Sequence, residues 1–357
     1  MNEDKYHEFE FLMKNRPHVV LLGAGATMAA IPNGDKNGRK SSVMDGFIEK
    51  LGMSSVIDKV GLHTNSNNLE DIYTELFERP DCESVRKQLD EKIREYFSCL
   101  EIPDEPNIYD LILLSLRKKD LVATFNWDPL LLQAYQRAIR ITKDLPSLAF
   151  LHGNVLVGYC LNHKYGGKID NICPECKEAF HPSRLLYPIR HKNYAADPFT
   201  QDNWNIIRNA FHRAYLVTVF GYSAPVTDVE AISLLKESWG KIDDRNLEDF
   251  EFIDIRSEDE LVDSWSEFIH SHHYTVVNDF FDSSLARYPR RTTVELFDRT
   301  MNCVWSESDP TFSFRENMTW DEIENVVGTL VSEERMLKSN SFLSIKNSKN
   351  RLAESQP

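Results

Sequence analysis

Short apolar segments rich in β-branched residues recur along this chain, and segments of helical periodicity separate them. The first, His18-Val-Val-Leu-Leu-Gly23, ends at a glycine, as expected of a parallel strand buried on both faces. Similar segments lie at 120–124, 148–151, 214–220 and 250–255, with helical segments such as 129–139 and 226–239 between them. This alternation predicts βαβ units, and therefore an α/β fold with a mostly parallel, Rossmann-like sheet.

Two regions depart from the alternation. Residues of about 36–118 have helical periodicity, with Phe47, Ile48 and Leu51 on one face, which predicts a helical insertion in a catalytic domain of residues 1–270. Helical segments at about 276–287, 292–301 and 320–337 predict a C-terminal helical region, 271–337. The remaining 338–357 stretch is rich in Ser, Asn and Lys, so we expect a disordered tail.

Length and composition narrow the class of protein. The chain has 357 residues, 41% of them hydrophobic, enough for one large core and a smaller appended domain. Its N-terminus resembles no signal peptide and no apolar stretch is long enough to span a bilayer, so we expect a soluble cytoplasmic protein that does not contact membranes. The net charge of -15 disfavours direct binding of nucleic acid, because phosphate backbones are repelled.

The first strand ends in Gly23-Ala24-Gly25-Ala-Thr27. Small residues in such a turn let backbone N–H groups approach a pyrophosphate, whose charge the following helix N-terminus favours. The third glycine of the dinucleotide-binding pattern is replaced by Met28, and a tight turn without a ligand explains the residues equally well.

The second strand ends in Thr-Phe-Asn126-Trp-Asp128-Pro129. The amide of Asn126 would lie at the mouth of the strand, where it can hold a hydroxyl group, a carboxamide or a water; a buried structural Asn is the competing interpretation. Asp128 before Pro129 is typical of a helix start, and capping explains it better than catalysis does.

The next two strands also end in polar or small residues. His152-Gly153 follows the third strand and offers an imidazole, the usual general base near neutral pH, although a single His is more often structural. Gly221-Tyr-Ser223 follows the fourth, where Ser223 could contact a phosphate or ribose or cap the next helix.

The most specific local pattern is a pair of knuckle-like motifs within about 158–190. Cys160-Leu-Asn-His163 is followed nine residues later by Cys173-Pro-Glu-Cys176. Four such ligands suit a tetrahedral Zn²⁺ with no open position, so this zinc would be structural and not catalytic.

Taken in order, the glycine turn, Thr-Phe-Asn126-Trp-Asp128, His152-Gly153, the cysteine-histidine pairs and Gly221-Tyr-Ser223 resemble the sirtuin superfamily over roughly residues 17–270. The resemblance implies NAD bound between a Rossmann-type domain and a small zinc module. It further implies these roles: phosphate contacts for Gly23, Ala24, Gly25 and Thr27, the nicotinamide ribose site for Asn126 and Asp128, the base for His152, and NAD contacts for Gly221 and Ser223.

One segment departs from the pattern of protein-deacylating sirtuins. Those enzymes carry Gly-Ile-Pro-Asp-Phe-Arg after the glycine turn, whereas this chain reads Ala30-Ile-Pro32-Asn33-Gly34-Asp35. Thr-Phe-Asn-Trp-Asp with Phe-Gly-Tyr-Ser looks more like sirtuin-like effectors of bacterial antiviral defence, a family that hydrolyses NAD. The predicted function is therefore an NAD+ glycohydrolase that depletes NAD; an NAD-dependent protein deacylase and a non-catalytic NAD or ADP-ribose sensor are the alternatives.

An intracellular NAD hydrolase must be kept inactive until it is needed, so we expect regulation through assembly. The helical insertion and the segment after residue 269 are the candidate interfaces for a homo-oligomer. The family resemblance adds one possible partner, a ring-shaped DNA-translocating ATPase.

Overall fold

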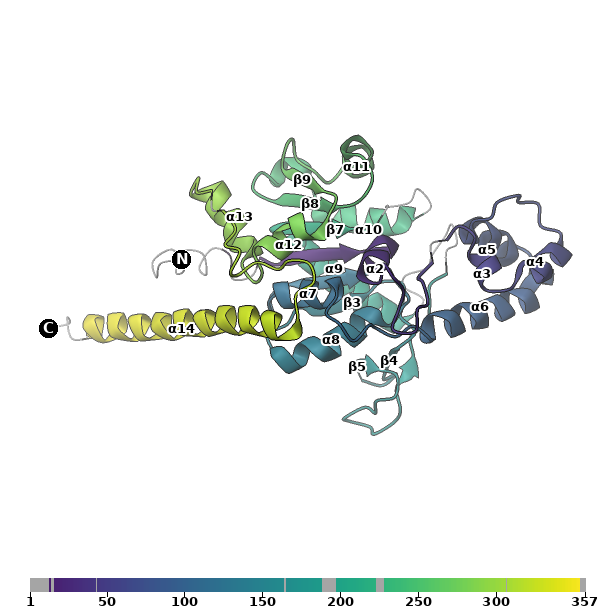
Figure 1. Cartoon of the computed structure of the whole chain (residues 1–357), viewed down its shortest axis with the longest axis horizontal. Coiled ribbons are helices and arrows are strands. Elements are labelled where there is room, and N and C mark those ends of the chain that lie inside the picture. The colour runs from purple at the N-terminus through teal and green to yellow at the C-terminus, as the bar shows by residue number, and fades with distance from the viewer. Residues whose placement is uncertain are drawn as a thin grey trace.

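The computed structural model describes residues 13, 16–42, 44–163, 165–187, 197–222, 228–305 and 307–353, with side chains through residue 337. Its centre is a six-stranded parallel sheet in the order β3-β2-β1-β7-β8-β9 (Figure 1). The strands are β1 His18–Leu22, β2 Leu121–Thr124, β3 Ser147–Phe150, β7 Leu216–Phe220, β8 Asp249–Ile253 and β9 Tyr274–Val277. The predicted α/β fold with a Rossmann-like parallel sheet is therefore confirmed.

Alternate residues of the strands face two separate cores. On β1, Val19 and Leu21 pack with α9 Pro198–Arg213, α10 Val229–Trp239 and α11 Glu258–Trp265. Val20 and Leu22 face the opposite side, where α2 Ala24–Ala30, α7 Ile108–Ser115, α8 Leu130–Ile141, α12 Ser284–Arg287 and α14 Trp320–Ala353 pack. Because both faces are covered, the central strands are largely apolar, and all five residues of β1 are buried.

The helical insertion between β1 and β2 is present as expected. It contains α3 Phe47–Lys50, α4 Ser54–Val60, α5 Leu69–Glu78, a 3-10 turn at Pro80–Cys82 and α6 Glu83–Ser98 before the chain returns through α7. In Figure 1 its helices α3 to α6 lie together at one end of the molecule. Their buried residues, such as Leu69, Leu76 and Leu89, belong to the same core as α7 and α8.

A second, small sheet carries the cysteine-histidine cluster. Its order is β5-β4-β6, with β4 Val157–Tyr159 pairing antiparallel to β5 Gly166–Lys168 and to β6 His181–Pro182. It follows β3 directly, so the end of the main sheet leads into this module.

The C-terminal region differs from the sequence prediction in two places. The helix expected from residue 276 is wrong at its start, because Tyr274–Val277 forms β9, which pairs with β8 and extends the sheet past residue 270. A 3-10 turn at Phe280–Asp282 and α12 follow, and α13 Thr292–Met301 has the expected bounds. Helix α14 begins at Trp320 as expected and continues to Ala353, into the stretch for which composition predicts disorder; residues 329–353 contain no Gly or Pro to end it.

The long α14 runs along the body of the molecule and projects beyond it at its C-terminal end (Figure 1). Among the described residues, no helix is both long and apolar enough to cross a membrane.

Candidate functional site

The carboxyl ends of β1 and β7 lie side by side at the centre of the sheet. From β1 the chain order runs through β2 to β3 on one side, and through β7 to β9 on the other. This reversal of strand order is where ligands of open α/β sheets bind, just beyond the strand ends. The turns after β1 and β7 therefore form the floor of the candidate site.

These two turns touch through their backbones, and this contact requires glycine. A Cβ atom on Gly23 would lie 2.4 Å from the carbonyl oxygen of Gly221, and one on Gly25 would lie 2.7 Å from the Gly221 Cα. Gly221 itself has a φ of 57°, a conformation that side chains rarely adopt. The backbone N–H of Gly25 donates to the Gly221 carbonyl at 3.0 Å, so it is not free for a phosphate in this conformation.

Asn126 lies at the mouth of β2, and its side-chain orientation is fixed. The amide Nδ2 donates to the Gly23 carbonyl at 2.7 Å and to Thr27 Oγ1 at 2.9 Å. A carbonyl can only accept a hydrogen bond, so the nitrogen end of the amide must face the glycine turn. Among the described residues none donates to the other end, Oδ1, which leaves one hydrogen-bond acceptor of a partly buried side chain available.

Thr27 and Asp128 lie beneath this asparagine. Both are buried, and the Thr27 hydroxyl donates to Asp128 Oδ2 at 2.8 Å. Burial raises the pKa of Asp128 above its usual range, and the hydrogen bond from Thr27 opposes this shift. Asp128 also accepts the N–H of Leu130, where α8 begins, so both side chains hold the local structure, and their direct contact with NAD stays a prediction.

His152 follows β3, one strand further from the centre. It is 8% exposed, its ring packs edge-on against Phe125 with centroids 5.0 Å apart, and Phe125 in turn stacks on Tyr222 at 4.0 Å. Its Nε2 lies 3.6 Å from Oδ2 of Asp228, which also accepts the Tyr222 hydroxyl at 3.0 Å. The imidazole therefore lies within ion-pair distance of a buried carboxylate.

The adjacent strands β2 and β3 place Asn126 and His152 at the same edge of the sheet. Thr124 pairs with Phe150 in the parallel register, and Asn126 and His152 each follow two positions later. Ser223, the other predicted contact at this edge, lies outside the described residues.

A cavity of about 600 Å³ opens on the other side of the glycine turns. Gly25 and Gly221 line it together with the ends of β7 and β8, including Asp254 and Ile255. The opposite walls come from 106–108 and Leu111, from 278–281 after β9, and from 315–318 before α14. Its volume is in the range of sites for small molecules and cofactors.

Sequence reasoning missed most of this cavity. Strand-end patterns indicate the glycine turns and the polar end of β8 at Asp254. The segments 278–281 and 315–318 carry no recognisable motif, and only the chain path brings them here. Asn126 and His152 are not among the lining residues, and the link between them and the cavity is the glycine turn itself, to which Asn126 donates a hydrogen bond.

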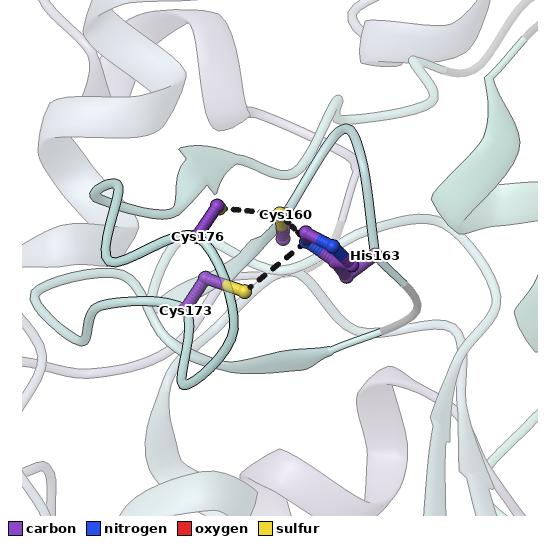
Figure 2. A group of neighbouring side chains, drawn as sticks. All are labelled: Cys160, His163, Cys173 and Cys176. Carbon is purple, nitrogen blue, oxygen red and sulfur yellow. Dashed lines mark hydrogen bonds between the residues drawn. The ribbon is translucent and has the colours of Figure 1, made fainter.

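Cys160, His163, Cys173 and Cys176 converge in the small sheet module (Figure 2). Their ligand atoms all lie within 4.8 Å of one another, with Cys160 Sγ 3.5 Å from His163 Nδ1 and 3.6 Å from Cys176 Sγ. A tetrahedral ion with Zn–S of about 2.3 Å and Zn–N of about 2.0 Å leaves about 3.5 to 3.8 Å between ligand atoms. The geometry therefore fits a structural zinc, and the four side chains could hold one with no further ligand.

Comparison with solved structures finds similar chains among the sirtuins. A structure of Sir2 with an inhibitor, 2′-O-acetyl-ADP-ribose and deacetylated p53 peptide is 17% identical and covers 76% of this chain and 93% of that one, with a TM-score of 0.36. A Sir2 structure with p53 peptide and NAD+ is 18% identical over 78% of this chain and 93% of that one, with a TM-score of 0.34.

A third structure, described as the structural basis of sirtuin substrate affinity, is 18% identical over 85% of this chain and 99% of that one, with a TM-score of 0.37. No protein-family model matches the sequence, and no curated protein matches it.

Proposed function

We propose that this chain hydrolyses NAD+ to nicotinamide and ADP-ribose. The observation that carries the proposal is the fixed amide of Asn126, whose Oδ1 is available at the strand mouth while His152 follows the neighbouring strand. An oriented acceptor can hold a water or a ribose hydroxyl, and an imidazole can take its proton. The glycine turns and the adjoining cavity offer a binding surface for the rest of the dinucleotide.

The proposed reaction breaks the bond between the anomeric carbon of the ribose and the nicotinamide nitrogen. Positive charge develops at the anomeric carbon, and nicotinamide leaves as a neutral molecule, so no acid is needed for its departure. Water then forms the new C–O bond, with Asn126 Oδ1 accepting one of its hydrogens. His152 receives the proton that the water releases, either directly or through a ribose hydroxyl, and Asp228 at 3.6 Å stabilises the resulting charge.

The proposed zinc has no part in these steps. Cys160, His163, Cys173 and Cys176 would hold it as a four-coordinate ion, which supplies only structural cross-linking of the small sheet.

The segment after α2 supports hydrolysis over deacylation. Asp35, which stands where the resemblance places an arginine in deacylases, has a fully buried side chain. Its carboxylate accepts the backbone N–H groups of Asn37, Arg39 and Glu101 at 2.9, 2.7 and 3.0 Å. The carboxylate thus anchors its own loop and cannot substitute for a guanidinium that contacts substrate.

The biological role that we propose is depletion of NAD in bacterial antiphage defence, through a homo-oligomer that a ring-shaped DNA-translocating ATPase activates. Support for this role comes from the sequence resemblance alone. It is tested by coexpressing the chain with the protein encoded next to it and measuring cellular NAD during phage infection.

The activity is tested by incubating the purified chain with NAD+ and measuring nicotinamide and ADP-ribose by chromatography. We expect both products from the wild type, alone or with the neighbouring gene product, and loss of both in Asn126→Ala and His152→Ala. A parallel reaction contains an acetyl-lysine peptide. NAD+ consumption only with the peptide would indicate a deacylase, and tight NAD+ binding without turnover would indicate a sensor; either result overturns the proposal.

A further inference from the structure

Tyr109 places a buried hydroxyl group directly behind the candidate site. It lies on α7, at the end of the helical insertion, and is 1% exposed. Its hydroxyl is 2.6 Å from Thr27 Oγ1 and accepts the Asn126 amide Nδ2 at 3.3 Å. A side chain from the insertion thus reaches both the glycine-turn helix and the asparagine at the mouth of β2.

The hydrogen atoms in this cluster can be assigned. The single hydroxyl hydrogen of Thr27 points to the Asp128 carboxylate, so in the 2.6 Å contact the Tyr109 hydroxyl is the donor and Thr27 the acceptor. Burial raises the pKa of Tyr109, which keeps the phenol protonated and able to donate. The amide nitrogen of Asn126 then has three acceptors around it, namely Gly23 O, Thr27 Oγ1 and Tyr109 Oη.

Each of these acceptors opposes a flip of the asparagine amide. After a flip, Oδ1 would face the Gly23 carbonyl, and two acceptors would meet without a hydrogen between them. Tyr109 contributes by accepting from the amide and by occupying the remaining lone pair of Thr27. Without its hydroxyl, Thr27 could turn its own hydrogen away from Asp128, and the amide would lose one of its fixed partners.

Tyr109 is itself held rigidly. Asn107 and Asp110 form a capping box at the start of α7, and Asp110 receives two hydrogen bonds from the guanidinium of Arg137 on α8, one of them at 3.1 Å from Nε. Other residues of α7, Ile108 and Leu111, line the cavity beside the glycine turns. Tyr109 therefore lies on a helix that is capped at its N-terminus and hydrogen-bonded to α8.

We infer that Tyr109 is a positioning residue, which orients the Asn126 amide so that Oδ1 faces the reacting water. This inference rests on the proposed hydrolysis of NAD+. The phenol does not touch the substrate, so its loss should lower the turnover number and leave substrate binding nearly unchanged.

The test compares Tyr109→Phe with a matched control, Tyr73→Phe. Tyr73 is also buried, and its hydroxyl donates at 2.6 Å to Asp90 within the helical insertion, with no hydrogen bond to Asn126, Thr27 or Gly23. Tyr109→Phe loses two hydrogen bonds, one to Thr27 and one from Asn126, and Tyr73→Phe loses one, so both variants should have lower melting temperatures and the larger decrease is expected in Tyr109→Phe. We expect kcat for NAD+ cleavage to fall about tenfold in Tyr109→Phe alone, with KM changing less than about threefold.

A second measurement does not depend on activity. In protein labelled with 15N-asparagine, the side-chain NH2 signals of Asn126, assigned with Asn126→Ala, should exchange slowly with solvent in the wild type and in Tyr73→Phe. They should shift and exchange faster in Tyr109→Phe.

The outcomes separate the two proposals. If the wild type does not cleave NAD+ under any condition, the proposed function fails, and the NMR result still tests the orienting contact. If the wild type is active and Tyr109→Phe retains full kcat, or if the Asn126 signals are unchanged in that variant, the positioning role is overturned.

Discussion

The side-chain amide of Asn126 donates a 2.7 Å hydrogen bond to the carbonyl oxygen of Gly23, joining the end of β2 to the turn after β1. This contact links the two strand ends on which the candidate site depends. It also explains why the residue type matters for structure before any substrate binds, since an amide can donate to a carbonyl and a carboxylate cannot.

We therefore expect Asn126→Asp to be less stable than Asn126→Ala. The aspartate would place a carboxylate oxygen against the Gly23 carbonyl, which should lower the free energy of unfolding by about 1 to 3 kcal/mol relative to alanine. Urea unfolding of the two variants measures this difference. The same Asn→Asp change at exposed Asn65 is the control and should have little effect; equal stabilities of the two Asn126 variants would contradict the expectation.

The backbone contact between the turns gives a second prediction. Ala at Gly221 would adopt a φ of 57° and place its Cβ 2.5 Å from the Gly25 Cα. Gly61 also has a positive φ, 62°, but nothing lies within 4 Å of its Cβ position. We expect Gly61→Ala to cost about 1 to 2 kcal/mol from backbone strain, and Gly221→Ala to cost more than about 3 kcal/mol because the clash adds to it. Thermal unfolding compares them, and similar melting temperatures would show that the turns do not touch.

The parts of this fold that could be predicted are those whose signal is local. The segment His18-Val-Val-Leu-Leu-Gly23 gives β1 because a strand buried on both faces must be apolar throughout. The bounds of α13 follow equally from periodicity. β9 was missed because Tyr274–Val277 is a short edge strand of partly exposed residues, and only its pairing with β8 distinguishes it from the start of a helix.

In the candidate site, too, only the residues that belong to a local sequence motif could be predicted. Cys160 and Cys176 belong to a spaced motif, so their convergence could be expected from sequence. Tyr109 belongs to no motif, and it meets Thr27 across 82 residues of chain. Such a contact follows from the packing of α7 against α2, which sequence periodicity alone does not specify.

The metal cluster is tested by measuring zinc in the purified protein. We expect one zinc per chain in the wild type, because four converging ligands remain stable without water in the coordination shell. Cys173→Ser should lose the metal and lower the melting temperature, since zinc binding contributes on the order of 10 kcal/mol to folding of such modules. Cys99→Ser, at an exposed cysteine, should keep both. A wild-type protein free of metal after purification without chelators would contradict this expectation.

A buried histidine should make stability depend on pH. Burial lowers the pKa of His18 from 6.5 to about 3, and its ring nitrogens contact Thr292 Oγ1 at 2.9 Å and Thr218 Oγ1 at 2.7 Å. Between these two pKa values the unfolded chain binds the proton and the folded protein does not. Stability from this group is therefore complete above about pH 6.5 and is lost as the pH falls, by at most about 1.4 kcal/mol per pH unit.

The pH effect is measured by urea unfolding at pH 7 and pH 5. Buried carboxyl groups with raised pKa values, such as Glu251, act in the opposite direction, so the informative quantity is the difference between wild type and His18→Gln. The variant should lose less stability on acidification than the wild type does. His63→Gln, at an exposed position, should behave like the wild type. Identical pH dependence of all three proteins would show that His18 does not titrate as inferred.

Besides its apolar contacts, α14 is held by Glu334, which forms buried ion pairs with Arg290 and, at 3.9 Å, with Arg117. Arg290, whose side chain is fully buried, makes two 2.8 Å hydrogen bonds to the carboxylate of Glu334 on α14. The next residue, Glu333, pairs with Arg291, but both of those side chains are more than a third exposed. Removing one partner of the buried pair leaves an uncompensated charge, so Glu334→Gln should lower the free energy of unfolding by about 3 to 5 kcal/mol.

The matched variant Glu333→Gln should cost less than about 1 kcal/mol, because an exposed pair is screened by solvent. Urea unfolding measures both values. Because Met318, just before α14, and Ile323, in its first turn, line the cavity beside the glycine turns, loosening this helix should also weaken NAD+ binding, which calorimetry can follow. Equal unfolding free energies for the two variants would mean that Arg290 keeps its charge compensated without Glu334, for example through Asp144 at 3.5 Å.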